Sequence, residues 1–320
     1  MSDKARASFL PRTLRIAVAV GLTAFIVWRA NLSEILKAAG ALDLRWAAAA
    51  ILLVFVDRAL NAYRWIELLC ALTPGSRPPF RTVLRIFFVS TFVGSFLPSV
   101  GGDIYRAYSL ANEEVRPAES AASVLMDRVL GVLSIVLLAI AVLPFVPQRV
   151  TDARLVMTLG LGLAGCAVVA FAVFSPRAAS VAQAFASRAP AARLQRVALS
   201  LSDAIRRYAH HRTELVKVLA ASIGVQFLRV IQAYCLGRGL SMDVPLVLYF
   251  VFIPLAMLVM QIPITILGLG IGQLAFVALF GQVNVPASQA VALSILFIAL
   301  GLVGNLPGAA LYAWGRPRTP

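Results

Sequence analysis

Charged residues are scarce in this 320-residue chain. Only 13% of the residues are Asp, Glu, Lys or Arg, and 60% are hydrophobic, whereas a soluble domain carries roughly 25% charged residues. So little charge cannot cover a surface that faces water, which excludes an ordinary soluble globular protein. The mean hydropathy of +0.87 indicates a chain solvated largely by lipid, and we expect a single integral membrane domain over residues 1–320.

Histidine, cysteine and lysine are also rare. The two histidines, His210 and His211, are adjacent in a basic segment, and the three cysteines, Cys70, Cys166 and Cys235, lie far apart in apolar stretches. Because no metal-ligand spacing is present, we expect no metal site and no cofactor. The three lysines all follow residues other than glycine, which excludes a Walker A nucleotide loop.

The arrangements that intramembrane enzymes need are missing as well. No histidine falls in an apolar run, which excludes a serine–histidine protease, and Asp103 follows two glycines but has no Tyr-Asp partner for an aspartyl protease. Asp103 and Asp127 are each followed closely by an arginine that favours the ionised carboxylate. We therefore expect no enzyme. The net charge of +15 lies in loops beside apolar runs, which indicates anionic lipid headgroups rather than nucleic acid.

Long apolar runs are what the chain has in abundance. Each membrane-spanning helix needs about 20 apolar residues, and the runs predict an all-α membrane bundle of about six to eight spans. The clear segments are 14–28, 46–72, 121–143, 155–174, 217–236, 244–262 and 286–313. The first of these segments, 14–28, has four basic residues before its apolar run and no signal-peptidase site after it. We therefore interpret it as an uncleaved span.

Basic residues then constrain the topology. The amino terminus, the 175–217 loop and the carboxy terminus are all rich in arginine, which places all three on the cytoplasmic side. A complete crossing by residues 82–98 would put the 175–217 loop outside. We therefore predict that residues 82–110 form a re-entrant hairpin, which enters and leaves on the cytoplasmic side.

A second interrupted stretch lies in the carboxy-terminal half. Residues 244–281 are broken by Pro263, Gly268 and Gly270, much as residues 82–110 are broken by Pro98 and Gly101. Free backbone groups at membrane depth are tolerated only where protein or a wet cavity surrounds them, and paired broken segments are typical of transporters with inverted repeats. The comparable positions of the two broken segments suggest that residues 1–143 and 217–313 form an inverted repeat, although the halves show no sequence identity. Charge does not decide whether 244–281 forms a hairpin or two spans.

An ionisable residue at the centre of a span raises the free energy of membrane insertion by roughly 2.5–3.5 kcal/mol, so each such residue is expected to have a structural or functional role. Asp57, Asn61 and Arg64 share one helical face, while Arg58 points away and is expected to need another partner. One interpretation is a salt-bridge network that only holds helices together. The other is a cationic cavity, built from arginines of several spans, that attracts an anionic headgroup while the tails stay in lipid.

The candidate headgroup contacts follow from the second interpretation. Glycines allow close approach of backbone to a ligand, and a planar guanidinium suits a pair of phosphate oxygens. Asp103 and Arg106 are spaced to pair if a helix restarts there, and the aspartates would orient the arginines. The predicted site residues are Arg64, Pro98, Gly101, Gly102, Asp103, Arg106, Asp127, Arg128, Gln226, Arg229, Gly268, Gly270 and Gln273.

Several of these residues resemble a known family. Residues 96–103 (FLPSVGGD), Tyr105-Arg106 and 127–131 (DRVLG), together with 63–65 (YRW), are similar to the lysylphosphatidylglycerol synthase transmembrane-region family, whose members are called flippase-like. The similarity runs along nearly the whole chain. One departure is that the Gly-Leu-Gly-x-Arg-Glu element of many members is replaced here by 268–273 (GLGIGQ), which loses both charges.

The resemblance implies lipid translocation without aminoacyl transfer, since the chain has no soluble domain for that reaction. Stand-alone relatives are linked to the movement of lipids that include polyprenyl-linked glycans and hopanoids, and the lipid expected here is an anionic amphipathic one of the phospholipid, glycolipid, polyprenyl-linked or hopanoid class. We thus expect a multi-pass lipid flippase or scramblase-like transporter of the bacterial inner membrane. Without a nucleotide site, its transport would be downhill or ion-coupled. The alternative is a non-transporting membrane subunit that binds lipid or serves as a scaffold for an envelope-lipid enzyme.

Overall fold

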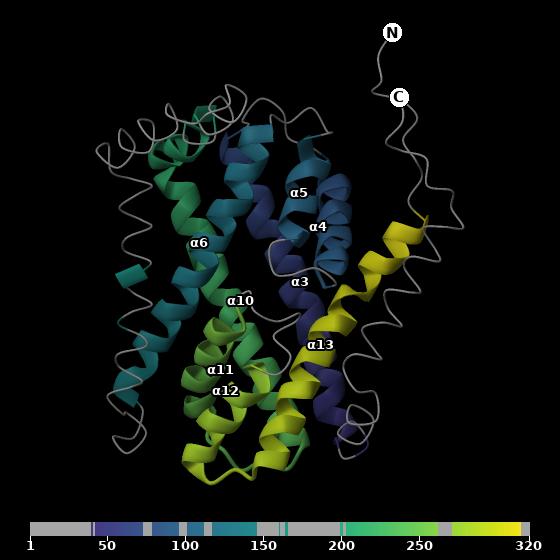
Figure 1. Ribbon diagram of the computed structural model, residues 1–320, viewed down its shortest axis with the longest axis vertical. Coiled ribbons are helices and arrows are strands. Elements are labelled where there is room, and N and C mark those ends of the chain that lie inside the picture. The colour runs from purple at the N-terminus through teal and green to yellow at the C-terminus, as the bar shows by residue number, and fades with distance from the viewer. Residues whose placement is uncertain are drawn as a thin grey trace.

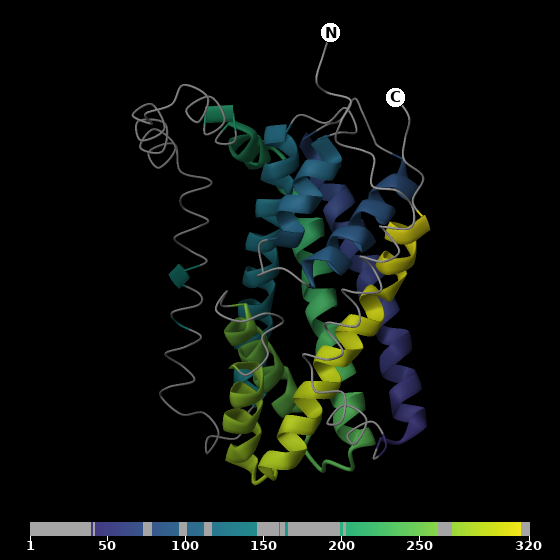
Figure 2. The ribbon, with the colours of Figure 1, turned by 45° about the vertical axis from the view of Figure 1, so that its right-hand side comes forward.

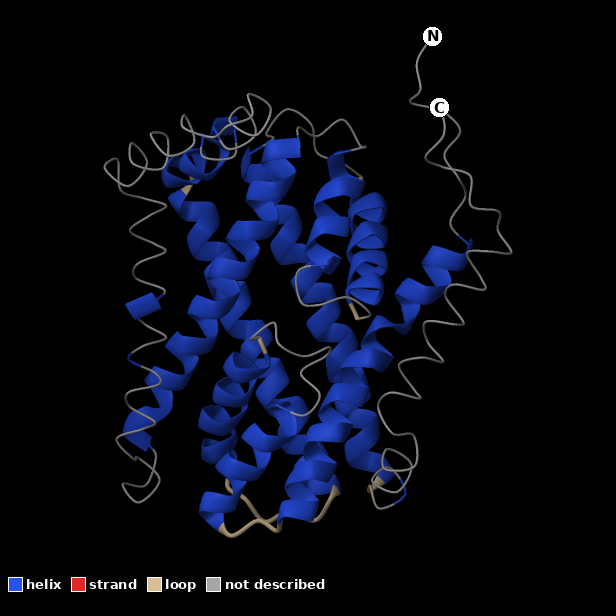
Figure 3. Cartoon of the chain, in the orientation of Figure 1, coloured by secondary structure: helices blue, strands red, loops and turns tan. Residues whose placement is uncertain are grey.

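The computed structural model describes residues 40, 42–72, 79–95, 101–111, 117–145, 160, 164–165, 199–200, 203–261 and 271–314. Within these residues helices are joined by short turns and loops, and no strand is present (Figure 3). The predicted all-α membrane bundle is confirmed.

The helices fall into two sets of the same design. The first set is α3 (Leu44–Leu72), α4 (Phe80–Gly94), α5 (Gly101–Ala111) and α6 (Pro117–Val142), which ends in the 3-10 turn η2 (Leu143–Phe145). After the turn η3 (Tyr208–His210), the second set is α10 (Arg212–Gly239), α11 (Leu246–Met260), α12 (Ile271–Phe280) with turn η4 (Gly281–Val283), and α13 (Ala287–Trp314). Each set runs from a long helix through two short helices to another long helix.

The first long helices of the two sets, α3 and α10, pack against each other in antiparallel directions along the length of the bundle (Figure 1). Hydrogen bonds at both ends show the direction. The backbone N–H of Asp43 donates to the carbonyl of Gly239 at 3.1 Å, and the hydroxyl of Tyr208 donates to the carbonyl of Leu68 at 2.8 Å. The start of each helix thus lies beside the end of the other.

The short helices form two hairpins at opposite ends of the bundle. In Figures 1 and 2, α4 and α5 occupy the upper half, and α11 and α12 occupy the lower half. The packing is reciprocal, because α4 packs on α13 of the second set and α11 packs on α6 of the first set. An antiparallel central pair with hairpins exchanged between the sets is the arrangement that an inverted repeat produces.

Details of the hairpins repeat as well. Both α4 and α11 contain 15 residues and begin directly after a proline, Pro79 or Pro245, whose fixed φ suits a helix start. Gly102 and Gly272 are each the second residue of the returning helix. These correspondences are too few and too widely spaced to give the two halves a recognisable sequence identity.

Glycines set the closest contacts between helices. A Cβ added at Gly102 would lie 2.8 Å from the Cα of Gly94, so the two helices of the first hairpin touch through their backbones. A Cβ at Gly308 would lie 2.1 Å from the backbone oxygen of Phe88, so α13 lies directly on α4. Small residues are the usual means of bringing membrane helices into contact.

The main apolar core lies around α11 and α12. Tyr249, Phe252, Phe276 and Phe280 are fully or almost fully buried, and their rings meet edge-on or stacked with centroids 5.2–5.8 Å apart. Aromatic pairs in these geometries stabilise a fold beyond the area that they bury. The lower hairpin is thereby fixed against the ends of α10 and α13.

The basic segment before α10 docks on the upper end of the bundle. Tyr208 is completely buried, and Arg207 pairs with Glu119 at 2.7 Å. Burial raises the pKa of the Tyr208 phenol far above its ordinary value, so the phenol stays protonated and keeps donating to Leu68. Helix α13 finishes in the same half of the bundle, at the level of the first hairpin (Figure 1).

Three described helices are long and apolar enough to cross a membrane, namely Leu44–Leu72, Pro117–Phe145 and Ala287–Ala313. Leu246–Met260 and Gly272–Val283 are apolar but shorter. The predicted segment 14–28, nearly all of 155–174 and most of the 175–217 loop lie outside the described residues, so the expected number of six to eight spans stays a prediction.

Candidate functional site

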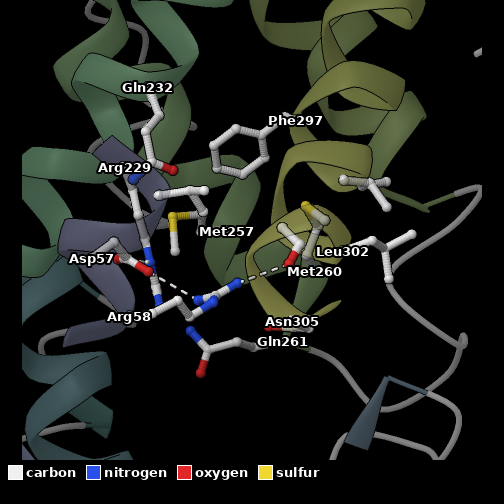
Figure 4. Close-up of a pocket in the computed structure, with 13 residues that line it drawn as sticks. Asp57, Arg58, Arg229, Gln232, Met257, Met260, Gln261, Phe297, Leu302 and Asn305 are labelled. Carbon is white, nitrogen blue, oxygen red and sulfur yellow. Dashed lines mark hydrogen bonds and ion pairs between the residues drawn. The ribbon is translucent and has the colours of Figure 1, made fainter. Parts of the chain in front are cut away.

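A cavity of about 270 Å³ lies between α3, α10, α11 and α13 (Figure 4). Its residues come from the middle of α3, from α10, from the inner end of α11 and from the middle of α13. Both sets of helices therefore contribute to it. Its polar lining consists of Asp57, Arg58, Arg229, Gln232, Gln261 and Asn305.

One carboxylate in this cavity holds two arginines. Asp57 is only 1% exposed; its two oxygens accept from Arg58 at 2.9 Å and from Arg229 at 3.0 Å. Arg58 also donates to the carbonyl of Gly301 at 3.1 Å. The sequence led us to expect a different partner for Arg58. Instead its long side chain bends back to its neighbour Asp57 and also reaches α13.

Charges in this group do not cancel. Two guanidinium charges against one carboxylate charge leave one net positive charge, and the other lining residues are uncharged. An uncompensated charge in an apolar interior is expensive. The cavity is therefore electrostatically suited to an anion.

Asn305 connects this cavity to the first hairpin. Its side-chain NH₂ donates to the hydroxyl of Ser95 at 2.9 Å, and Ser95 is the residue directly after α4. Gln261 is the residue directly after α11 and also lines the cavity. The inner end of the second hairpin thus lines the charged cavity, and the inner end of the first hairpin is joined to the cavity through Asn305.

A second ion-pair group lies between α3, α5 and α6. Asp127 accepts from Arg64 at 2.9 Å and from Arg106 at 3.3 Å. The guanidinium of Arg106 also lies over the rings of Trp65 and Phe87, 5.0 and 5.1 Å from their centroids. Arg106 is 9% exposed, so it ties the first hairpin to α3 and α6.

Asp103 and Arg128 form a third ion pair, between α5 and α6. Asp103 and Arg106 are therefore not partners of each other, although their spacing allows it. Each instead reaches across to one of two consecutive residues of α6, Arg128 and Asp127. The restart of the helix at Gly101 positions both side chains toward α6.

The predicted site residues thus divide among several places. Arg229 lines the cavity, whereas Arg64, Arg106, Asp127, Asp103 and Arg128 form the two other groups. Gln226 is buried and donates to Ser134 at 3.3 Å, and Gln273 lies on α12. Gly101 and Gly102 begin α5, and Gly102 is in the hairpin contact. Pro98, Gly268 and Gly270 lie outside the described residues.

Several cavity residues were missed by the sequence analysis. Asp57 and Arg58 were noticed as charges within a span, and Arg58 was counted among the arginines of the expected cationic cavity, but neither was among the predicted headgroup contacts. The amides of Gln232, Gln261 and Asn305 gave no signal, because single Gln and Asn residues in apolar runs are common packing residues. The relevant signal was the excess of arginine over aspartate within the spans.

The described residues contain no group of three His, Cys, Asp or Glu side chains that could hold a metal ion. The lining of the cavity offers guanidinium and amide donors, which suit phosphate or carboxylate oxygens. Together, the fold and the site define an α-helical membrane protein with a charged cavity between α3, α10, α11 and α13.

The chain belongs to the family described as the lysylphosphatidylglycerol synthase TM region, which matches residues 12–308. This family is a membrane domain associated with lipid flippase-like function. The chain matches no curated protein and no solved structure.

Proposed function

We propose that this protein moves a lipid across the membrane, with the headgroup passing through the cavity beside Asp57, Arg58 and Arg229 while the acyl or prenyl tails remain in the bilayer. The observation that carries the proposal is a charged cavity lined by helices of both inverted sets, with the end of the second hairpin in its wall and the end of the first joined to it through Asn305. Transporters with inverted repeats place their substrate site at such a point, where broken helices meet near mid-bilayer.

The size of the cavity supports a headgroup rather than a whole lipid. Its volume of about 270 Å³ is at the lower end for small-molecule sites, which run to roughly 1,000 Å³. The contact residues would be Arg58, Arg229 and the amide side chains. In this proposal the ion pairs of Arg64, Arg106 and Arg128 hold the first hairpin in place, and no residue acts as a catalyst.

Orientation follows from the basic residues. The first hairpin, the start of α10 and the end of α13 lie at one end of the bundle, and Arg206, Arg207 and Arg212 are at that end. The positive-inside rule assigns this end to the cytoplasm. We infer an inner-membrane location, with the first hairpin re-entrant from the cytoplasmic side and the second from the opposite side.

A reconstitution experiment tests the proposal. Proteoliposomes would receive acyl-labelled phospholipids, glycolipids and polyprenyl phosphates, and translocation would be followed by the accessibility of the label to a membrane-impermeant quencher. We expect Arg229→Gln to slow translocation by about tenfold or more, because it removes a charged donor worth roughly 1.5–3 kcal/mol. Arg238→Gln is the matched control, since Arg238 is an exposed arginine of the same helix outside the cavity.

The alternative is a lipid-binding subunit that transports nothing. This alternative is supported by the ion pairs of Asp127 with Arg64 and Arg106, because such pairs can hold helices together without any role in transport. If folded, reconstituted protein moved none of the lipids in the panel, the transport proposal would fail. Equal rates for Arg229→Gln and Arg238→Gln would remove the cavity from the transport path.

A further inference from the structure

One side of α6 is polar from its upper end to the middle of the helix. The residues of this side follow one another at intervals of three or four positions, which places them in a line along the helix. This polar face consists of Ser120, Ser123, Asp127, Gly131 and Ser134. It runs for about 21 Å at the rise of an α-helix. The next residue of the line, Leu138, is apolar and packs in the main core, so the polar face occupies only one half of the helix.

The lower end of the polar face leads toward the cavity. The side-chain NH₂ of Gln226, on α10, donates to the hydroxyl of Ser134 at 3.3 Å and to the carbonyl of Gly131 at 3.4 Å. Gln226 lies one helical turn before Arg229, which lines the cavity. The carboxamide oxygen of Gln226 is buried and has no hydrogen-bond partner among the described residues. This network therefore lacks one donor, which water or a headgroup hydroxyl provides when the face is hydrated.

Helices α5 and α3 cover the upper part of the polar face, and Figure 1 shows α5 beside the upper half of α6. The hydroxyl of Ser120 donates to the carbonyl of Ala107 at 2.8 Å, and the indole N–H of Trp65 donates to the hydroxyl of Ser123 at 3.3 Å. Both serines are 0% exposed. The polar face is therefore closed to water in this structure.

Helix α5 is held over the polar face by polar contacts. Of its side chains that the structure describes, only that of Arg106 is buried, and α5 contributes no residue to the apolar clusters of the described helices. Its ion pairs to α6 are Arg106 with Asp127 and Asp103 with Arg128. Water or a phosphate group can replace each of these polar contacts at little net cost.

The corresponding helix of the second hairpin, α12, is attached in the opposite way. Phe276 and Phe280 of α12 are 1% and 0% exposed and pack in the main apolar core. Water cannot replace such contacts, because aromatic surface that leaves the core for water loses its hydrophobic stabilisation. Entry of water and a polar headgroup therefore favours movement of α5 and not of α12.

Resting on the proposed function, we propose that the polar face of α6 is the half of the headgroup route between the cytoplasmic leaflet and the cavity, and that α5 moves aside to open it. The headgroup would exchange its contacts with water for contacts with the serine hydroxyls of the polar face. Its phosphate would meet the guanidinium groups that α5 and α6 share in the closed protein, with Arg128 the most exposed of them.

The accessibility of single cysteines to water tests this route. After replacement of the native cysteines, a membrane-impermeant thiol reagent would be added to inside-out vesicles, and the rate of labelling would be measured by mass spectrometry. Such a reagent attacks the thiolate, which requires water around the sulfur. Ser123→Cys and Ser134→Cys probe the polar face. Ala122→Cys and Ala139→Cys are the matched controls, because both alanines are 0% exposed residues of α6 within apolar clusters.

We expect the two cysteines of the polar face to react about tenfold or more faster than the two controls, because opening of α5 hydrates only that side of α6. Asp103→Asn removes an ion pair that holds α5 and should raise the labelling rate of Ser123→Cys by up to about fivefold. Asp243→Asn removes an exposed ion pair with Arg238 at the other end of the bundle and should leave that rate unchanged.

Translocation measured before and after labelling connects accessibility with transport. A bulky adduct on Ser123→Cys should abolish translocation, whereas the same adduct on Gln282→Cys, at an exposed position outside the polar face and the cavity, should not. Protected cysteines on the polar face of a protein that moves lipid would overturn this inference alone, and so would transport that persists after labelling. Labelling of the polar face in a protein that moves no lipid even before the reagent is added would contradict the proposed function itself.

Discussion

Asp57 and Arg229 form an ion pair of 3.0 Å that joins the two halves of the bundle across the α3–α10 interface. Arg58 binds the other oxygen of the same carboxylate and also reaches α13. One buried carboxylate thus holds three helices around the cavity. Removing Asp57 raises the net positive charge of the cavity, whereas removing one arginine lowers it. The two changes should therefore differ in their effect on stability.

Asp57→Ala should destabilise the protein far more than Arg58→Gln. The first change leaves two buried guanidinium groups without a counter-charge, at a cost of roughly 3–5 kcal/mol. The second leaves a neutral Asp57–Arg229 pair and should cost about 1 kcal/mol. Thermal unfolding of the detergent-solubilised protein measures both, and equal losses would show that the net charge of the cavity does not matter for stability.

Arg106→Ala should lower stability. The side chain stacks on Trp65 and Phe87 and pairs with Asp127, and loss of these contacts should cost about 2–3 kcal/mol. Arg106→Lys should recover only part, because an ammonium has no plane to stack on the rings. The same thermal assay tests this. An Arg106→Ala protein as stable as wild type would contradict the role of this residue in holding the hairpin.

Gly308→Ala should separate α13 from α4. The new Cβ would lie 2.1 Å from the backbone oxygen of Phe88, which cannot move without displacing the helix, so we expect a cost of about 1–3 kcal/mol. Gly281→Ala is the control, because a Cβ there meets nothing within 4 Å. Comparison of the two unfolding temperatures in one detergent decides the matter, and equal values would argue against the close contact.

Cross-linking at the Ser95–Asn305 contact should stop transport. After replacement of the native cysteines, Cys70, Cys166 and Cys235, a short thiol-specific cross-linker would join Ser95→Cys to Asn305→Cys. If the inner end of the first hairpin must move for the headgroup to pass, translocation should fall on cross-linking and return on cleavage of the linker. Each single cysteine variant, treated in the same way, is the control. Undiminished transport in the cross-linked protein would show that this contact stays closed during the cycle.

Sequence patterns predicted the helical class and the two interrupted segments because these depend on local chemistry. Apolar runs of membrane length favour helices, and Pro98, Gly101, Pro263, Gly268 and Gly270 interrupt such runs because proline and glycine disfavour a continuing helix. The ion-pair partners of the charged residues could not be predicted from local spacing. Asp103 and Arg106 are three residues apart, yet each pairs with α6, since the packing of α5 on α6 brings two further charges closer.

Two features of this protein follow from its composition and local order alone, namely that lipid surrounds most of its outer surface and that arginine exceeds aspartate within its spans. The tertiary structure alone decided where that excess lies. Antiparallel packing of α3 on α10 brings Arg229 to Asp57 across 172 positions of chain, and the packing of α13 on α4 places Asn305 beside Ser95. These contacts depend on how whole helices fit together, and no local pattern encodes such a fit.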